Sequence, residues 1–335
     1  MTPTKVPNAD WKVFQGDGRH PHQALADLPL PPWRKSQRIS RPEKFSAALL
    51  ERDALKAKPF LPGKPMVWAV NAALYLRRPL LLTGKAGSGK STLISKVAQE
   101  LMLGPVLRWD ITSRSTARSG IYDYDAVGRL QKGGARKKEP PIGDYLALGP
   151  LGTAMLGTTW PRALLIDEID KGDLDLANDL LNVIEEGTFD IPELRRLGQK
   201  PVKIRDGFNR EVTIRGGRLE CRQFPFVAMT SNAEREFPPP FLRRCVRLTI
   251  KPPEDYDGFS RIVNAHLEEH LGYADQKKLK ALIDAFLESA KTTELATDQL
   301  LNAVFLTIGM NDGSERRLSD QELKALQAML LEKLA

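Results

Sequence analysis

Short apolar runs alternate with stretches of helical apolar spacing over the first 230 residues of the chain. Runs that are apolar along most of their length, and are followed by glycine or polar residues, lie at 79–83, 106–109, 162–166 and 225–230. Such runs are typical of strands that are buried on both faces of a parallel sheet. Helical spacing separates them, for example at 66–76 and at 91–103, where Gly104 is a natural stop signal. The alternation predicts an α/β fold with a doubly wound parallel sheet.

The pattern changes near residue 255, after which no strand is predicted. Four helical segments follow, near 256–271, 276–290, 297–309 and 320–334. The last opens with Ser319 and Glu322, which have the spacing of a capping box. We therefore expect an α/β core at 63–252 and a smaller all-helical lid domain at 253–335.

The first 62 residues have a different composition from the rest of the chain. They are rich in proline and charge and show little sustained periodicity, apart from a short helix expected near 45–55. Residues 1–62 are therefore predicted to form an extended arm. This arm is expected either to be a solvated linker or to pack on a neighbouring subunit.

Composition places the chain among ordinary globular proteins of the cytoplasm. Hydrophobic residues make up 41% of the 335 positions and charged residues 27%. No apolar run reaches the roughly 18 residues that a membrane span requires, and the N-terminus lacks the pattern of a secretory signal. Cys221 and Cys245 are too few for a disulfide framework, which fits a reducing compartment. We expect a cytoplasmic protein with no membrane partner.

The strongest motif is a glycine-rich loop between the first predicted strand and the helix that follows it. Its sequence, GKAGSGKS at 84–91, fits the pattern GxxxxGK[ST]. In such a loop the backbone N–H groups surround a phosphate at the positive end of a helix. Lys90 is expected to reach the β- and γ-phosphates of ATP, and Ser91 to offer its hydroxyl to Mg²⁺. The expected nucleotide-binding residues are Gly84, Lys85, Ala86, Gly87, Ser88, Gly89, Lys90, Ser91 and Thr92.

A second motif lies about eighty residues further on, where the apolar run ALLI ends in two adjacent carboxylates. Asp167 is expected to hold the Mg²⁺ shell together with Ser91. Glu168, the next residue, points to the other side and can polarise the attacking water as a general base. Acidic strand ends are common, so it is the position downstream of the phosphate loop that gives this pair its meaning.

Further candidates follow the last predicted strand. Asn232 stands at the strand tip, where it can contact the γ-phosphate or the attacking water. A proline-rich turn then precedes Arg243 and Arg244. Arginine at such a place suits stabilisation of charge on a transferring phosphoryl group, and a neighbouring subunit can supply it.

With these motifs in this order, the chain resembles the AAA+ ATPases and, within them, the MoxR-like branch, over roughly residues 65–310. The resemblance implies that Asn232 is the sensor 1 residue, that Arg244 is the arginine finger, and that 186–224 carries a β-hairpin insertion. It also implies a homo-hexameric ring with nucleotide at each subunit boundary. Members of this branch typically act as chaperones beside a partner that bears a von Willebrand factor A domain.

Two positions depart from the family pattern. At the start of the third lid helix, where many AAA+ proteins have a sensor 2 arginine, this chain has ATDQ at 296–299. The residue after the finger is Cys245 rather than the usual aromatic residue, which leaves open whether Arg243 or Arg244 reaches the neighbour.

A basic segment lies within the expected insertion. Between Arg195 and Arg222 there are nine Lys or Arg and three Asp or Glu, and the turn signals Asp206-Gly207 and Gly216-Gly217 suggest hairpins. Such a segment can contact an acidic protein or follow a nucleic-acid backbone. Because Phe208 is its one aromatic residue, base stacking is poorly supported and the protein contact is favoured.

Two short patterns are set aside. His266 to His270 fits HxxEH, a zinc-peptidase pattern, and 170–173 faintly resembles a guanine-reading motif; both are interpreted as accidental. The leading hypothesis is therefore a ring ATPase that remodels a protein partner. A nucleic-acid motor or restriction-type ATPase of a defence system is the alternative, and a monomeric kinase or transferase is a third class.

Overall fold

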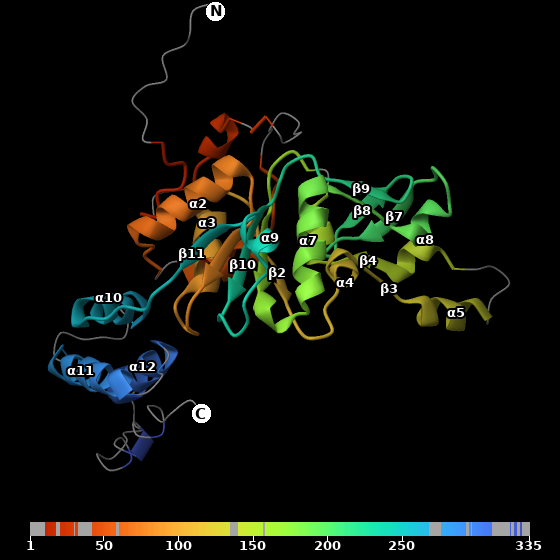
Figure 1. Ribbon diagram of the computed structural model, residues 1–335. Helices are drawn as coiled ribbons and strands as arrows, with labels where there is room; N and C mark the ends of the chain where they lie inside the picture. Colours follow the sequence, from red (N-terminus) through yellow and green to blue (C-terminus); the bar gives the residue numbers. More distant parts are fainter. Residues whose placement is uncertain are drawn as a thin grey trace, which may run out of the picture.

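The computed structural model describes most of the chain. The described residues are 11–17, 21–29, 31–32, 42–57, 60–134, 140–156, 158–267, 276–292, 295, 297–309, 322, 325, 326 and 329. Figure 1 shows an α/β domain in the middle, a second layer of strands on one side of it and a group of helices on the other.

The centre of the α/β domain is a parallel sheet of five strands. Every neighbouring pair of strands is parallel, and the spatial order is β11 (Val246–Thr249), β1 (Leu80–Thr83), β10 (Phe226–Ser231), β5 (Ala163–Asp167) and β2 (Leu107–Asp110). Four of these strands lie within about a residue of their expected positions. The edge strand β11 was missed, because its alternating sequence VRLT does not give a continuous apolar run.

Helices cover both faces of this sheet, which confirms the doubly wound α/β prediction. Side chains alternate along each strand, so that Leu80 and Leu82 enter one core and Leu81 enters the other. One face is covered by α2 (Lys64–Leu76) and α3 (Lys90–Glu100), and the other by α4 (Ala117–Ile121), α6 (Pro150–Ala154) and α7 (Leu174–Glu186). The short helix α9 (Pro239–Leu242) follows β10 (Figure 1).

The described part of the N-terminal region packs on the chain's own α/β domain, so it is not the solvated linker that was one expectation for residues 1–62. Phe14 is fully buried in the core beneath α2 and α3. Asn71 of α2 holds this segment, because its Oδ1 accepts the backbone N–H of Val13 at 2.7 Å and its Nδ2 donates to the carbonyl of Phe14 at 2.8 Å. The turn η1 (Ala24–Asp27) and helix α1 (Ala47–Ala57) continue the layer. Sparse apolar residues without periodicity gave no sign of this packing.

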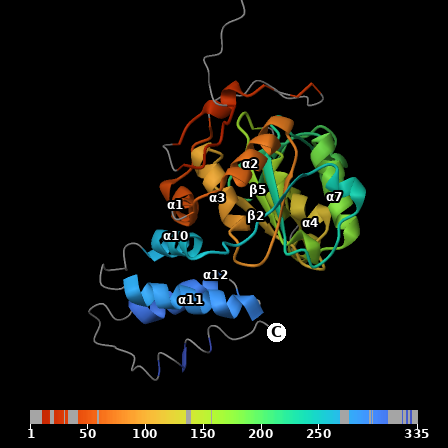
Figure 2. The same cartoon turned by 60° about the vertical axis from the view of Figure 1, so that its left-hand side comes forward.

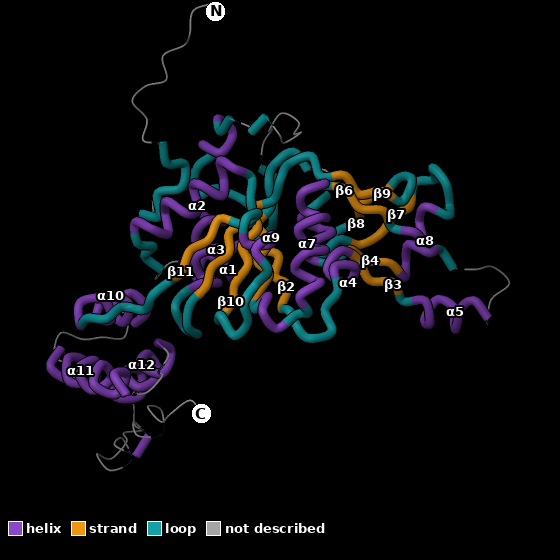
Figure 3. The backbone as a smooth tube through the Cα atoms, viewed as in Figure 1, coloured by secondary structure: helices purple, strands orange, loops and turns teal. Residues whose placement is uncertain are grey.

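The insertion forms a second sheet rather than an isolated hairpin. Its order is β3 (Tyr122–Tyr124), β4 (Leu146–Leu148), β7 (Val202–Arg205) and β8 (Glu211–Ile214), with α5 (Ala126–Gly134) and η2 (Ile142–Tyr145) between β3 and β4. The turn at Asp206-Gly207 joins β7 to β8 as an antiparallel hairpin, as predicted. The turn at Gly216-Gly217 does not form a second hairpin. Instead β9 (Arg218–Glu220) pairs with β6 (Thr188–Asp190), and α8 (Pro192–Arg195) follows β6 (Figure 3).

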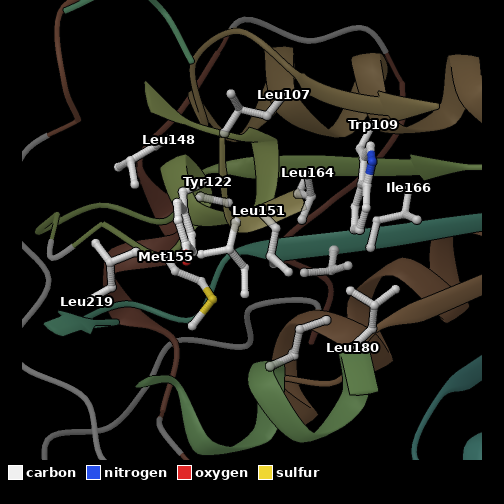
Figure 4. Packing of buried hydrophobic residues seen from close by; sticks show 14 of the residues in the cluster. Leu107, Trp109, Tyr122, Leu148, Leu151, Met155, Leu164, Ile166, Leu180 and Leu219 are labelled. Carbon is white, nitrogen blue, oxygen red and sulfur yellow. The ribbon is translucent and has the colours of Figure 1, made fainter. Parts of the chain in front are cut away.

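A continuous apolar core joins the insertion sheet to the main sheet. Figure 4 shows Leu164 and Ile166 of β5 and Leu107 and Trp109 of β2 near Leu151 and Met155. Tyr122 and Leu148 of the insertion sheet belong to the same buried cluster. The insertion sheet is therefore fixed to the main sheet by shared hydrophobic burial, which resists independent movement.

The C-terminal helices form a separate small bundle. They are α10 (Tyr256–Leu267), α11 (Gln276–Thr292) and α12 (Thr297–Val304), which continues into a π-helical turn at Phe305–Gly309. Phe259, Ile283, Phe286 and Leu300 make their own core. Figure 2 shows α10 between the α/β domain and the pair α11 and α12. The fourth expected helix, 320–334, lies almost wholly outside the described residues. Among the helices that are described, none is long and apolar enough to span a membrane.

Candidate functional site

The glycine-rich loop connects β1 to α3 at the carboxyl edge of the main sheet. Gly84 has a φ of +148°, and a Cβ atom there would lie 2.3 Å from the carbonyl oxygen of Ile250. Gly89 has a φ of +83°, and a Cβ there would meet the ring of Phe60 at 2.5 Å. Glycine is required at both positions, because other residues would be strained and would clash. The loop thus delivers the chain to the N-terminus of α3, where backbone N–H groups can bind an anion.

Lys90 is the first residue of α3, and its ammonium group lies at the centre of the loop. The group donates to the carbonyls of Gly84 at 2.6 Å and Lys85 at 2.8 Å, and to Oδ1 of Asn232 at 2.9 Å. Burial lowers the pKa of Lys90, while the carboxylates of Asp167, Asp170 and Glu168 act in the opposite direction. The loop and the last strand tip therefore meet at one cation, and the carboxylates at and after the end of β5 favour its charged form.

Asp167 ends β5 and is surrounded by donors from three elements. Its Oδ1 accepts the hydroxyl of Ser91 at 3.0 Å and that of Thr230, and its Oδ2 accepts from Arg108 at 2.7 Å. The pairing of Ser91 with Asp167 offers the hard oxygen ligands that Mg²⁺ prefers. This donor set fits a magnesium ion, which when bound beside phosphate oxygens would neutralise charge that develops on the transferred phosphoryl group.

Glu168 has an unusual backbone conformation for its residue type. Its φ is +56°, in the left-handed region, and its backbone N–H donates to Oγ1 of Thr230 at 2.9 Å. Its carboxylate accepts from Lys171 of the short turn η3 (Ile169–Lys171) at 2.7 Å. Left-handed non-glycine residues cost free energy and are concentrated at functional sites. Glu168 and Asp167 both line the cavity described below.

These residues line a cavity of about 930 Å³ between the α/β domain and the helical bundle. The volume is near the upper end of the range for small-molecule and cofactor sites, about 300–1,000 Å³. The floor of the cavity is residues 86–92 with Arg108, Asp167, Glu168 and Asn232. Gly84 and Lys85 are not among the lining residues and contribute through their carbonyls, which accept from Lys90. The other walls come from Phe60, Leu61, Gly63 and Met66, from Ile250 to Asp255, and from Gly258, Arg261, Ile262, His266, Thr297, Asp298 and Leu301.

Sequence reasoning missed several of these lining residues. Arg108 and Thr230 lie on β2 and β10, the two neighbours of β5, and reach Asp167 only through strand pairing. Phe60 and Met66 were assigned to the arm and to a plain helix, although an aromatic and a thioether beside a phosphate loop suit a purine base. The available signal for Arg108 and Thr230 was a polar residue one or two positions before the last residue of each strand.

Arg243 and Arg244 are not among the residues that line this cavity. Arg244 contacts α7, where Nε lies 3.5 Å from the Glu185 carboxylate and NH1 donates to Asn182 at 3.3 Å. The side chain of Arg243 is exposed, and its carbonyl accepts from Arg78 at 3.0 Å. Within one chain, the structure therefore brings together Lys90, Ser91, Asp167, Glu168 and Asn232, and keeps both arginines apart from them.

The helical bundle brings a cation to the cavity from its first helix, and not from the start of its third helix, where many AAA+ proteins have the sensor 2 arginine. Thr297 and Asp298 line the cavity at that place, and Arg261 of α10 lines it from the first helix of the bundle. His266 also lines the cavity, with Nδ1 2.9 Å from the carbonyl of Ile262. The rest of the HxxEH pattern beyond Leu267, including His270, lies outside the described residues.

Comparison with known proteins identifies the class in agreement with this geometry. Residues 79–245, which contain the loop, the acidic strand end and Asn232, match a family model of AAA domains. The matching family model is described as the dynein-related subfamily of AAA domains. No curated protein matches the chain.

Similar solved structures show low sequence identity. The S. cerevisiae Hsp104–ADP complex is 17% identical with a TM-score of 0.43, over 77% of this chain and 46% of that one, so the present chain spans less than half of it. Domain III of the Thermotoga maritima replication initiation protein DnaA is 14% identical with a TM-score of 0.43, over 87% of this chain and 100% of that one.

Proposed function

We propose that this chain binds ATP with Mg²⁺ in the cavity and hydrolyses the γ-phosphate. The observation that carries the proposal is the contact of Lys90 with Asn232, because it joins the phosphate loop to the last strand tip above the Ser91–Asp167 pair. A phosphate chain on the loop would replace the carbonyls of Gly84 and Lys85 as acceptors for Lys90. The N-terminus of α3 stabilises the same charge.

Glu168 is the proposed general base. Its carboxylate pairs with Lys171, and both side chains are over two fifths exposed. An exposed pair of this kind contributes only about 0–1 kcal/mol, so the carboxylate is free to turn toward a water molecule beside the γ-phosphate. The Thr230 hydroxyl contacts both the backbone N–H of Glu168 and the carboxylate of Asp167. It thereby holds Asp167 for the metal and Glu168 for the attacking water.

Replacement of the loop cation tests the assignment directly. Lys90→Ala removes the side-chain cation that faces the phosphates, so titration with a fluorescent ATP analogue should show at least about a tenfold loss of affinity. Lys203→Ala is the matched control, since it removes the same charge from a side chain that is 69% exposed on β7. Equal affinity in the two variants would contradict the assignment of the loop.

We further propose a MoxR-like ring, of six subunits by family resemblance, that remodels or matures a protein partner, with a von Willebrand factor A domain protein beside it. The positions of Arg243 and Arg244 support the ring, because both lie outside the cavity of their own chain and can serve the site of the next subunit. A head-to-tail contact that closes on itself produces such shared sites.

The environment of the insertion supports a protein partner over a nucleic acid. Phe208 is not available for base stacking, since its ring packs edge-on against Phe45 at 5.2 Å and beneath the guanidinium of Arg210 at 5.1 Å. Arg210 is itself neutralised by Asp206 at 2.8 Å and by Glu43 at 3.1 Å. Exposed cations of the insertion lie near α8, on β7 and around the β8–β9 turn, where they suit an acidic polypeptide surface.

A further inference from the structure

Asp170 is a buried acid that the hydrolysis scheme above does not use. It lies in the η3 turn after β5, and its residue is only 2% exposed. Its Oδ1 has no hydrogen-bond partner among the described residues, and no ion pair to it is found there. A buried carboxylate in this condition destabilises the fold unless other groups compensate it.

The other oxygen of Asp170 holds the loop that follows β10. Oδ2 accepts the backbone N–H of Asn232 at 3.0 Å and that of Glu234 at 3.1 Å. Ala233, between them, has a φ of +63°, a left-handed conformation that an alanine adopts at a cost. Strained backbone of this kind persists when several contacts fix it, and here one carboxylate oxygen supplies two of them.

The consequence is a chain of contacts from Asp170 to the phosphate loop. Asp170 fixes the backbone of Asn232, and the Asn232 side chain accepts from Lys90 at 2.9 Å. The negative charge of Asp170 also acts on Lys90, because it favours the charged ammonium form. The turn after β5 and the loop after β10 are thereby joined directly above the cavity floor.

We propose that Asp170 is a positioning residue for ATP hydrolysis, which holds the loop 232–234 so that the Asn232 amide faces Lys90 and the terminal phosphate. This inference rests on the proposed ATPase function. Asp170 does not contact the nucleotide in this scheme, so its removal should slow turnover much more than it weakens ATP binding.

Two substitutions separate position from charge. Asp170→Ala removes both acceptor contacts, and we expect kcat to fall about 10- to 100-fold while the Kd for ATP changes less than about threefold. Asp170→Asn keeps an oxygen where Oδ2 lies but loses the charge, so it should retain kcat within about threefold of the wild type. If Asp170→Asn is as slow as Asp170→Ala, the charge matters and the positioning role is wrong. The unfolding temperature of both variants shows whether a loss of kcat comes from misfolding.

A double-mutant cycle with Asn232→Ala tests whether Asp170 affects kcat through Asn232. If Asp170 acts through Asn232, adding Asp170→Ala to Asn232→Ala should cost less than about twofold in kcat, since neighbours in one network are not additive. Full additivity would overturn the inference. Failure of the proposed function looks different, because the wild type itself would then show no ATP turnover.

Discussion

At the scale of single residues, the sequence was most informative where one motif fixes both spacing and conformation. Lys90 and Ser91 follow a loop whose glycines require positive φ angles, so their placement at the N-terminus of α3 could be predicted without the fold. Arg108 and Thr230 could not be predicted in this way. They reach Asp167 across strand pairs, and the sequence alone does not give the order β10-β5-β2.

Glu168→Gln should separate nucleotide binding from hydrolysis. The amide keeps the size of the side chain but cannot accept a proton from water, so we expect kcat to fall by roughly 10²–10⁴ while ATP affinity stays within about threefold. Phosphate release and analogue titration measure the two quantities. Lys171→Gln is the matched control, because it removes the cation from the same pair and should leave turnover within about threefold. Near-normal turnover in Glu168→Gln would place the base elsewhere.

At the scale of elements, local turn chemistry could be predicted but long-range pairing could not. The β7–β8 hairpin could be predicted from the Asp206-Gly207 turn, because turn type and strand alternation are local signals. The parallel pairing of β7 with β4 joins segments more than fifty residues apart, and it turns the expected hairpin into one side of a four-stranded sheet. The short strands β3 and β4 are each three residues long, too short to show a clear period.

The exposed cations of the insertion should not contribute to hydrolysis itself. Reversal of Arg215 and Arg218 to Glu should leave basal ATP turnover within about twofold, because neither residue lines the cavity and both are exposed. The control variant reverses Lys56 and Lys280, which are exposed on α1 and α11.

The same assay distinguishes the nature of the partner. Single-stranded DNA and duplex DNA should leave wild-type turnover unchanged at both 50 and 200 mM salt, about the range over which phosphate contacts weaken strongly. Stimulation that disappears at the higher salt, and is lost in the Arg215/Arg218 variant alone, would instead favour a nucleic-acid motor.

At the scale of the whole molecule, the fold class and the order of its parts could be predicted from the chain, but the role of its N-terminal region could not. The strands and helices of the α/β domain have strong periodic signals, and so do the helices of the C-terminal bundle. The buried segment around Phe14 has no regular structure of its own, so only its contacts with α2 and α3 reveal that it belongs to the core. Assembly of several chains lies beyond what one chain's pattern encodes.

Mixing two inactive variants tests whether sites are shared in the proposed ring. Glu168→Gln lacks the base and Arg244→Ala lacks the finger, so a mixed ring contains some boundaries with an intact base on one side and an intact finger on the other. We expect the mixture to recover about a quarter of the wild-type rate at equal amounts if pairing is random. Arg243→Ala in place of Arg244→Ala identifies which arginine is needed. A mixture as inactive as its parents, with subunit exchange demonstrated, would exclude a shared site.

The helix α2 connects the cavity to the turn that carries Arg243 and Arg244, which has a consequence for the proposed ring. Its first turn, with Met66 and the preceding Gly63, lines the cavity, and Arg78, just past its last residue, donates to the carbonyl of Arg243. Thirteen helical residues span about 20 Å, and a packed helix moves as a stiff rod. If nucleotide binding tilts α2, the turn that carries Arg243 and Arg244 should move with it, because Arg78 contacts that turn. In the proposed ring, nucleotide binding in one subunit would then affect the site of the next subunit through movement of α2.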